Sequence, residues 1–96
     1  MSDDDAVVRG RFTIVNEKGM HARAASALVA VASGFPCTIS LSGPEEAGVN
    51  AKSVMGVLLL CGSKGTVVEV EARGERAKDA VAAIGALIAN RFGEDR

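Results

Sequence analysis

The chain has 96 residues, of which 48% are hydrophobic and 3% aromatic, and its formal net charge at pH 7 is -1. This length fits one domain with one core, built mostly from aliphatic side chains. A nucleic-acid binder would be expected to carry a basic stripe with aromatic side chains, so the composition argues against that class. The acidic start at residues 2–5 does not resemble a secretion or import signal, and the apolar run at 54–61 is too short to span a bilayer. We therefore expect a cytoplasmic protein without membrane insertion.

Hydrophobic periodicity divides the chain into alternating strands and helices. In chain order it predicts a strand at 9–15, a helix at 22–33, a strand at 37–42, the short return arm of a hairpin at 47–51, a helix at 54–61, a strand at 66–73 and a helix at 75–92. Gly34 ends the first of these helices and Gly93 closes the last one. Residues 1–96 are expected to form a single domain, with frayed tails at 1–7 and 93–96.

Each predicted strand has one apolar and one polar face. The strand at 66–73 is the clearest case, because Val68, Val70 and Ala72 lie on one face while charged residues lie on the other. A sheet with one face in water is antiparallel or mostly so, and its helices lie on the opposite face. The order β-α-β-β-α-β-α therefore predicts an α+β fold.

The only histidine, His21, stands where a strand pattern gives way to a helix pattern, with Arg23 two places on. A helix N-terminus presents unpaired N–H groups, here those of Ala22, Arg23 and Ala24, and so it can hold a phosphoryl group. Arg23 would add charge-assisted hydrogen bonds from its planar guanidinium group. Neutral imidazole can attack phosphorus at physiological pH. The pattern favours His21 as a phosphoryl acceptor. The alternative is that His21 is an ordinary surface or capping residue and Arg23 is merely solvated.

Other chemistries find less support. A single histidine does not make a zinc site, and neither Ser26 nor Ser33 lies in a nucleophile elbow. The glycines and lysine at 62–66 lack the spacing of a phosphate-binding loop. Cys37 and Cys61 lack metal-ligand spacing, and we expect both to be reduced and buried, with a disulfide as the less favoured alternative. We expect no metal and no cofactor.

Three segments resemble one known family. Residues 19–25, reading Gly-Met-His-Ala-Arg-Ala-Ala, resemble the active-site segment of the HPr family, the phosphocarriers of the bacterial phosphoenolpyruvate-dependent phosphotransferase system. Residues 50–58 resemble its regulatory-serine region and residues 64–70 its last strand. The resemblance implies an open-faced β-sandwich, with a four-stranded antiparallel sheet of order 1-4-2-3 and three helices on one face. The chain departs from the pattern at Ala24, where many members have proline. Some enteric members also carry lysines around the docking face, and in this chain Ala30 and Gly56 occupy that neighbourhood.

The resemblance also implies roles for individual residues in a phosphocarrier that is not itself an enzyme. His21 would accept a phosphoryl group on Nδ1 from enzyme I and pass it to IIA-type domains, with Arg23 contacting that group. Ser53, which precedes an apolar run and so indicates a helix N-cap, would also be the target of a serine kinase or phosphorylase. Docking would use Met20, Ser26, Val54, Met55 and Leu58.

Three alternatives stay open at this point. The apolar segment at 54–60 is expected to point Val57 and Leu60 inward, but the whole segment sinking into the fold is a second interpretation. The protein as a whole is either a carrier for sugar permeases or a regulatory interaction module of nitrogen-type or kinase-controlled signalling. A ligand-binding module without phosphotransfer is disfavoured, because few polar residues converge. A monomer is expected.

Overall fold

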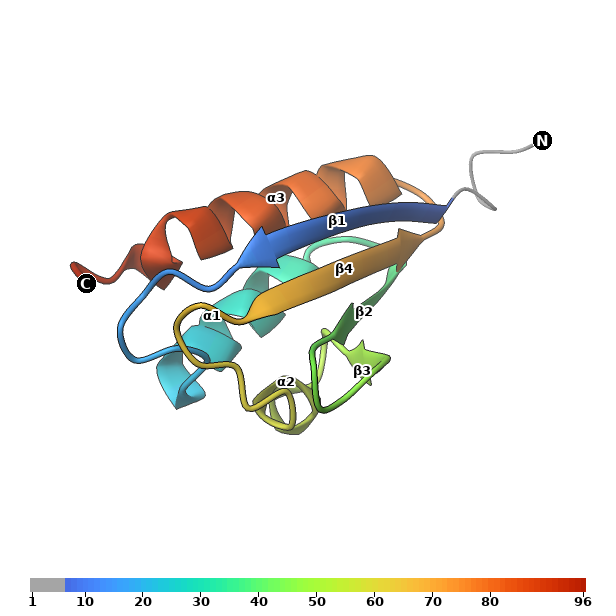
Figure 1. Cartoon of the computed structure of the whole chain (residues 1–96). Coiled ribbons are helices and arrows are strands. Elements are labelled where there is room, and N and C mark those ends of the chain that lie inside the picture. Colours follow the sequence, from blue (N-terminus) through green and yellow to red (C-terminus); the bar gives the residue numbers. More distant parts are fainter. Residues whose placement is uncertain (1–6) are drawn as a thin grey trace.

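The computed structural model describes residues 7–96, which form a four-stranded sheet with helices packed against it (Figure 1). In chain order the elements are β1 (Val7–Thr13), α1 (Ala22–Ser33), β2 (Thr38–Ser42), β3 (Val49–Asn50), α2 (Val54–Leu58), β4 (Val67–Arg73), α3 (Ala77–Ala89) and η2 (Arg91–Gly93). The strand order is β1-β4-β2-β3, and every neighbouring pair is antiparallel. The predicted α+β fold is confirmed, as is the sheet order that the resemblance implied.

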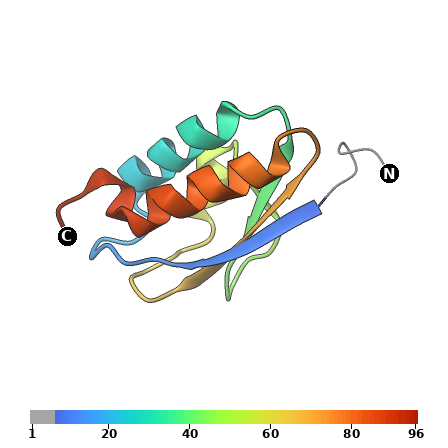
Figure 2. The same cartoon turned by 90° about the horizontal axis from the view of Figure 1, so that it is seen from above.

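The core lies between the sheet and the helices. In β4, Val68, Val70 and Ala72 are buried while both ends of the strand are exposed, so the predicted alternation is confirmed. Helices α1 and α3 lie side by side over the sheet and run in opposite directions (Figure 2). Full burial of a leucine such as Leu28 contributes about 1.5–3 kcal/mol, and an aliphatic core of this kind supplies most of the folding free energy.

Helix α1 begins and ends where the periodicity predicts. His21 is its N-cap and Gly34 its C-cap, and its buried side chains are those of Ala24, Ala25, Leu28 and Ala32. The short strand β3 pairs with β2 at the edge of the sheet, as expected for the return arm of a hairpin.

Helix α2 is shorter than predicted, because it ends at Leu58 rather than at residue 61. Val57 and Leu60 are buried as expected, but Leu59 between them is 55% exposed. Cys61 then takes a left-handed backbone conformation, with φ of 50°, and its side chain is exposed. The expectation of a buried cysteine is therefore confirmed for Cys37 and wrong for Cys61, and both thiols are free.

The C-terminal segment departs most from the prediction. Helix α3 ends at Ala89 rather than at residue 92. Phe92 is buried, but its backbone has a left-handed conformation and does not continue the α-helix. Residues 94–96 are not frayed, because Glu94 accepts a hydrogen bond from the Asn16 side chain and the Arg96 carbonyl accepts one from the Glu17 amide.

The N-terminal boundary also moves. Val7 pairs with Arg73 as part of β1, so it is not in a frayed tail, and residues 1–6 of that predicted tail lie outside the described residues. Within residues 7–96, no helix has the length and apolar character needed to cross a bilayer.

Candidate functional site

His21 is held at the start of α1 by its own backbone and ring. Its backbone is extended, and its carbonyl accepts the Ala25 N–H at 2.8 Å, which begins the helical ladder. Its ring nitrogen Nδ1 accepts the backbone N–H of Arg23 at 3.3 Å. The imidazole thus takes the place that a serine or aspartate oxygen usually fills at an N-cap. The capping interpretation of His21 is confirmed, and the side chain is still 28% exposed.

The first-turn amides lie where the sequence predicts them. Ala22, Arg23 and Ala24 come before the first residue that has an intrahelical acceptor, so their N–H groups point out of the helix start. Ala22 and Arg23 are exposed, whereas Ala24 is buried against the core. The Arg23 amide lies beside Nδ1, so a group bonded to that nitrogen would meet this donor first.

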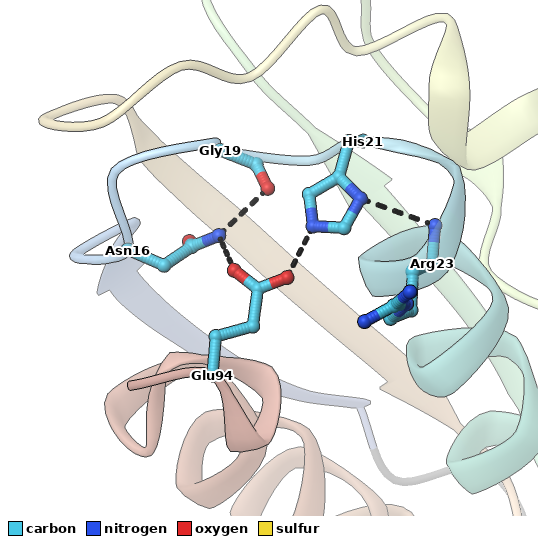
Figure 3. A network of polar contacts seen from close by, with 5 residues as sticks. All are labelled: Asn16, Gly19, His21, Arg23 and Glu94. Carbon is cyan, nitrogen blue, oxygen red and sulfur yellow. Dashed lines mark hydrogen bonds and ion pairs between the residues drawn. The ribbon is translucent and has the colours of Figure 1, made fainter. Parts of the chain in front are cut away.

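Glu94 joins the site from the other end of the chain. One carboxylate oxygen contacts Nε2 of His21, and the other accepts a hydrogen bond from Asn16 Nδ2 at 2.8 Å (Figure 3). The Asn16 side chain is completely buried and also donates to the Gly19 carbonyl at 2.9 Å. The hydrogen bond from Asn16, followed by the contact with His21, lowers the pKa of Glu94 below its ordinary value. The Glu94 carboxylate is therefore ionised at neutral pH.

Sequence reasoning missed both Asn16 and Glu94. The predicted elements leave Asn16 between a strand and a helix and put Glu94 in a frayed tail, and Glu94 is 73 residues from His21 along the chain. The one signal in the sequence is an asparagine directly before the loop that precedes His21. That signal is weak, because asparagine is common in loops.

A hollow of about 550 Å³ opens between the C-terminal segment and the loop before α1, and its lining includes Lys18, Arg23 and Glu94 but not His21. Arg23 is exposed and takes no part in the ion pairs found within residues 7–96. Its guanidinium is therefore available to bind an anion through its planar fork of donors. The charge of the hollow is mixed, because the carboxylates of Glu17 and Glu94 line it together with Lys18 and Arg23.

Ser53 caps α2, as the sequence predicts. Its hydroxyl accepts the Gly56 N–H at 3.2 Å, which satisfies one amide at the start of this five-residue helix. Helices α1 and α2 pack against each other.

The predicted docking residues differ in exposure. Met55 is 74% exposed and Ser26 is exposed on α1, while Val54 and Leu58 are half-buried. Met20 is only 5% exposed, because it packs into the core while its N–H donates to the Gly62 carbonyl at 2.7 Å. Met20 therefore offers almost no side-chain surface to a partner.

A partly exposed histidine at the start of a helix, with an unpaired arginine two residues on, defines a class: small α+β proteins that are phosphorylated on histidine. Known proteins agree with that class. The family pattern described as "PTS HPr component phosphorylation site" matches residues 8–90. Phosphocarrier protein HPr of Xylella fastidiosa (strain Temecula1) is 47% identical over 86 residues, which cover 88% of this chain and 93% of the relative.

Two further comparisons extend the match. Phosphocarrier protein NPr of Escherichia coli is 38% identical over 88 residues, covering 92% of this chain and 98% of that protein. The crystal structure of HPr from Thermoanaerobacter tengcongensis superimposes with a TM-score of 0.86 at 37% identity, covering 93% of this chain and 99% of that one. The chain belongs to the HPr family, the phosphocarriers of the phosphotransferase system, which act as phosphotransfer intermediates rather than turnover enzymes.

Proposed function

We propose that His21 receives a phosphoryl group on Nδ1 from phosphorylated enzyme I and passes it to a histidine of a IIA-type domain. The observation that supports this most directly is the environment of Nδ1, which faces the Arg23 amide at the open start of α1. The Nδ1 lone pair forms the new bond to phosphorus as the bond between phosphorus and enzyme I breaks, leaving its electron pair on enzyme I. The ring keeps its Nε2 proton throughout. Transfer to the IIA domain reverses these steps at His21.

The surroundings of His21 supply what this step requires. The amides of Ala22, Arg23 and Ala24 would donate hydrogen bonds to the phosphoryl oxygens, and the Arg23 guanidinium would offset their charge. The small side chains of Ala22 and Ala24 leave the approach to the ring open. Two successive partners therefore have access to the same nitrogen.

The test is phosphorylation of the purified protein by enzyme I and radiolabelled phosphoenolpyruvate. We expect labelling that is lost in acid and survives in base, which distinguishes phosphohistidine from phosphoserine. His21→Ala and His21→Asn should both abolish labelling, and asparagine keeps a good N-cap, so a loss in both reports the missing imidazole and not a damaged helix. Undiminished labelling of either variant would overturn the assignment.

Arg23 is tested in the same assay. Arg23→Ala should lower the rate of transfer by about tenfold, the effect of losing one hydrogen bond to a charged group, while the unfolding free energy stays the same. A wild-type transfer rate in this variant would remove Arg23 from the mechanism.

Docking should use the exposed and half-exposed side chains beside the helix starts, Ser26, Val54, Met55 and Leu58. Met55 suits more than one partner because its flexible thioether repacks against different surfaces. Met55→Asp should weaken transfer from enzyme I and to IIA domains, and Leu59→Asp, at the exposed residue that caps the end of the same helix, is a matched control. Equal effects of the two substitutions would argue against a docking role particular to Met55.

A second function, control through Ser53, is supported by the position of this residue at the start of α2. A phosphate there would add about -1.5 to -2 charges beside the docking residues while the helix start tolerates it. Ser53→Asp, which keeps an N-cap, should slow transfer from enzyme I, whereas Ser53→Asn should not. Equal transfer rates in the two variants would count against regulation by charge.

We also propose that the protein is a cytoplasmic monomer, because its partners in the phosphotransferase system act in that compartment and transfer needs a free face around His21. Light scattering of the purified protein, with and without enzyme I, would check the monomer. A stable dimer that buries His21 would contradict it.

A further inference from the structure

The chain turns back after α3 in an unusual way. Arg91, Phe92 and Gly93 all have positive φ values, of 57°, 55° and 82°, and only glycine adopts that conformation without strain. The turn is anchored by the buried Phe92 ring and by a hydrogen bond of 3.0 Å from Arg91 Nη1 to the Asp95 carbonyl. Backbone outliers of this kind cluster at functional sites, where the surrounding structure holds them in place.

This turn places the Glu94 side chain against the His21 ring. The Glu94 side chain is only 17% exposed and both carboxylate oxygens have a partner, Asn16 on one side and His21 on the other. Asn16 is itself fixed, because it is completely buried and its amide also donates to the Gly19 carbonyl. The carboxylate therefore has a defined position beside the ring, as Figure 3 shows.

The two ring nitrogens of His21 meet opposite partners. Nε2 faces a carboxylate oxygen, which only accepts, and Nδ1 faces a backbone N–H, which only donates. A neutral imidazole satisfies both contacts in one tautomer alone, with the proton on Nε2 and the lone pair on Nδ1. The network thus assigns the tautomer in which Nδ1 is the nucleophile.

We infer that Glu94 is a positioning residue for phosphotransfer: it holds the Nε2–H of His21, keeps Nδ1 as the nucleophile, and offsets the positive charge that the ring gains when Nδ1 bonds to phosphorus. The inference rests on the proposed function, since it assumes that His21 is the acceptor. No proton moves in the step, and the ring becomes a cation because Nδ1 shares its lone pair with phosphorus while Nε2 keeps its hydrogen. A fixed carboxylate on the far nitrogen stabilises such a cation, as it does in catalytic triads.

Two observations separate this role from a lid over the active site. Glu94 covers Nε2 and leaves Nδ1 to the Arg23 amide, and the His21 side chain is still 28% exposed. Glu94 lies outside residues 8–90, which the family pattern matches.

The experiment compares wild type with Glu94→Ala and Glu94→Gln, and uses Asp95→Ala as a control that removes a neighbouring negative charge. Nitrogen-15 NMR of the His21 ring reports the tautomer, and rapid-mixing assays with phosphorylated enzyme I report the transfer rate. The wild type should show one tautomer, with hydrogen on Nε2 and slow exchange of that proton. Glu94→Ala should lose the slow exchange and transfer about tenfold more slowly.

The glutamine variant separates position from charge. Glutamine has one accepting oxygen for the two donors that the carboxylate serves, so with that oxygen on Nε2–H its amide nitrogen faces Asn16 Nδ2. We therefore expect the wild-type tautomer, held less firmly, together with a transfer rate below that of wild type. The Asp95→Ala variant should match wild type in both measurements. These results together would show that Glu94 sets the tautomer and the transfer rate of His21, which a purely structural contact would not do.

Three outcomes would overturn the inference. One is an unchanged rate and unchanged ring signals in Glu94→Ala, and another is faster transfer in that variant, which would make Glu94 a lid. The third is a wild type with hydrogen on Nδ1. If the wild type takes no phosphoryl group from enzyme I at all, the proposed function fails together with the inference, whereas wild-type labelling with an indifferent Glu94→Ala leaves the proposed function intact.

Discussion

Asn16 is the one polar side chain that is completely buried within residues 7–96, and its amide links the loop before α1 to the C-terminal segment. Its Nδ2 group donates to the Gly19 carbonyl and to the Glu94 carboxylate. Removing it would leave two acceptors short of a donor in a place that water reaches poorly. At the scale of single residues, the site therefore depends on a side chain that never touches the phosphoryl group.

Asn16→Ala should lower the free energy of unfolding by about 1–3 kcal/mol, the cost of leaving buried hydrogen-bonding groups without partners. Urea denaturation monitored by circular dichroism measures the change. Arg9→Ala is the control, because the Arg9–Glu71 pair on the open face of the sheet is exposed and such pairs contribute about 0–1 kcal/mol. Equal destabilisation by the two substitutions would mean that Asn16 is no more than a surface residue.

Whether a residue of the site can be predicted depends on how far it lies along the sequence from the residues that it contacts. His21 and Arg23 are predictable, because the amides that surround them are their own neighbours in the same helix start. Glu94 is not predictable, because its contact with His21 spans 73 residues and depends on the left-handed turn at 91–93. Hydrophobic periodicity predicts a helix that continues to Phe92 and does not predict that turn.

At the scale of elements, β1 and α3 pack through a slot for one aromatic ring. Phe12 on β1 lies between Gly10 on its own strand and Gly85 on α3, and a methyl group at Gly85 would overlap Cε1 and Cζ of the ring. The periodicity predicts both elements and their inward faces. It does not predict the slot, since a glycine within a helix pattern reads only as a weak point.

In Gly85→Ala, helix propensity and packing have opposite effects on the unfolding free energy. Alanine in a helix interior is about 1 kcal/mol better than glycine, but overfilling a packed site costs about 1–3 kcal/mol. We expect packing to prevail, with a net loss of about 1–2 kcal/mol in urea denaturation. In a Phe12→Leu background, which empties part of the slot, the same substitution should become neutral or stabilising. A stabilising effect in the wild-type background would show that the ring moves aside without cost.

At the scale of the whole molecule, the site exists because α1 and α3 run in opposite directions over one sheet. The start of α1 and the end of α3 then lie at the same end of the molecule, where the C-terminal segment meets His21 (Figure 2). The sheet order 1-4-2-3 follows from the family resemblance, but the contacts of the last six residues do not, because the family pattern matches only residues 8–90. The predicted fold therefore brings the end of α3 close to the start of α1, but it does not predict the contact between Glu94 and His21.

This arrangement predicts how the molecule responds to acid. The groups that face Glu94 are the Asn16 amide, the His21 ring and the nearby Lys18 ammonium, and these lower its pKa in the folded state. A carboxylate with a lowered folded pKa contributes stability that is complete above the ordinary glutamate pKa, about 4.3. That contribution is lost as the pH falls through the folded value, because the unfolded chain then binds the proton more readily.

The difference in unfolding free energy between wild type and Glu94→Gln should therefore be largest near neutral pH and shrink as the pH is lowered below about 4.3. Urea denaturation of both proteins at a series of pH values from neutral to strongly acidic measures it. Asp95→Asn, one residue further along, should show a much smaller pH-dependent difference, because the Asp95 side chain is exposed. If the wild-type advantage persisted unchanged into strong acid, the ionised carboxylate would not be what fastens the C-terminal segment to the start of α1.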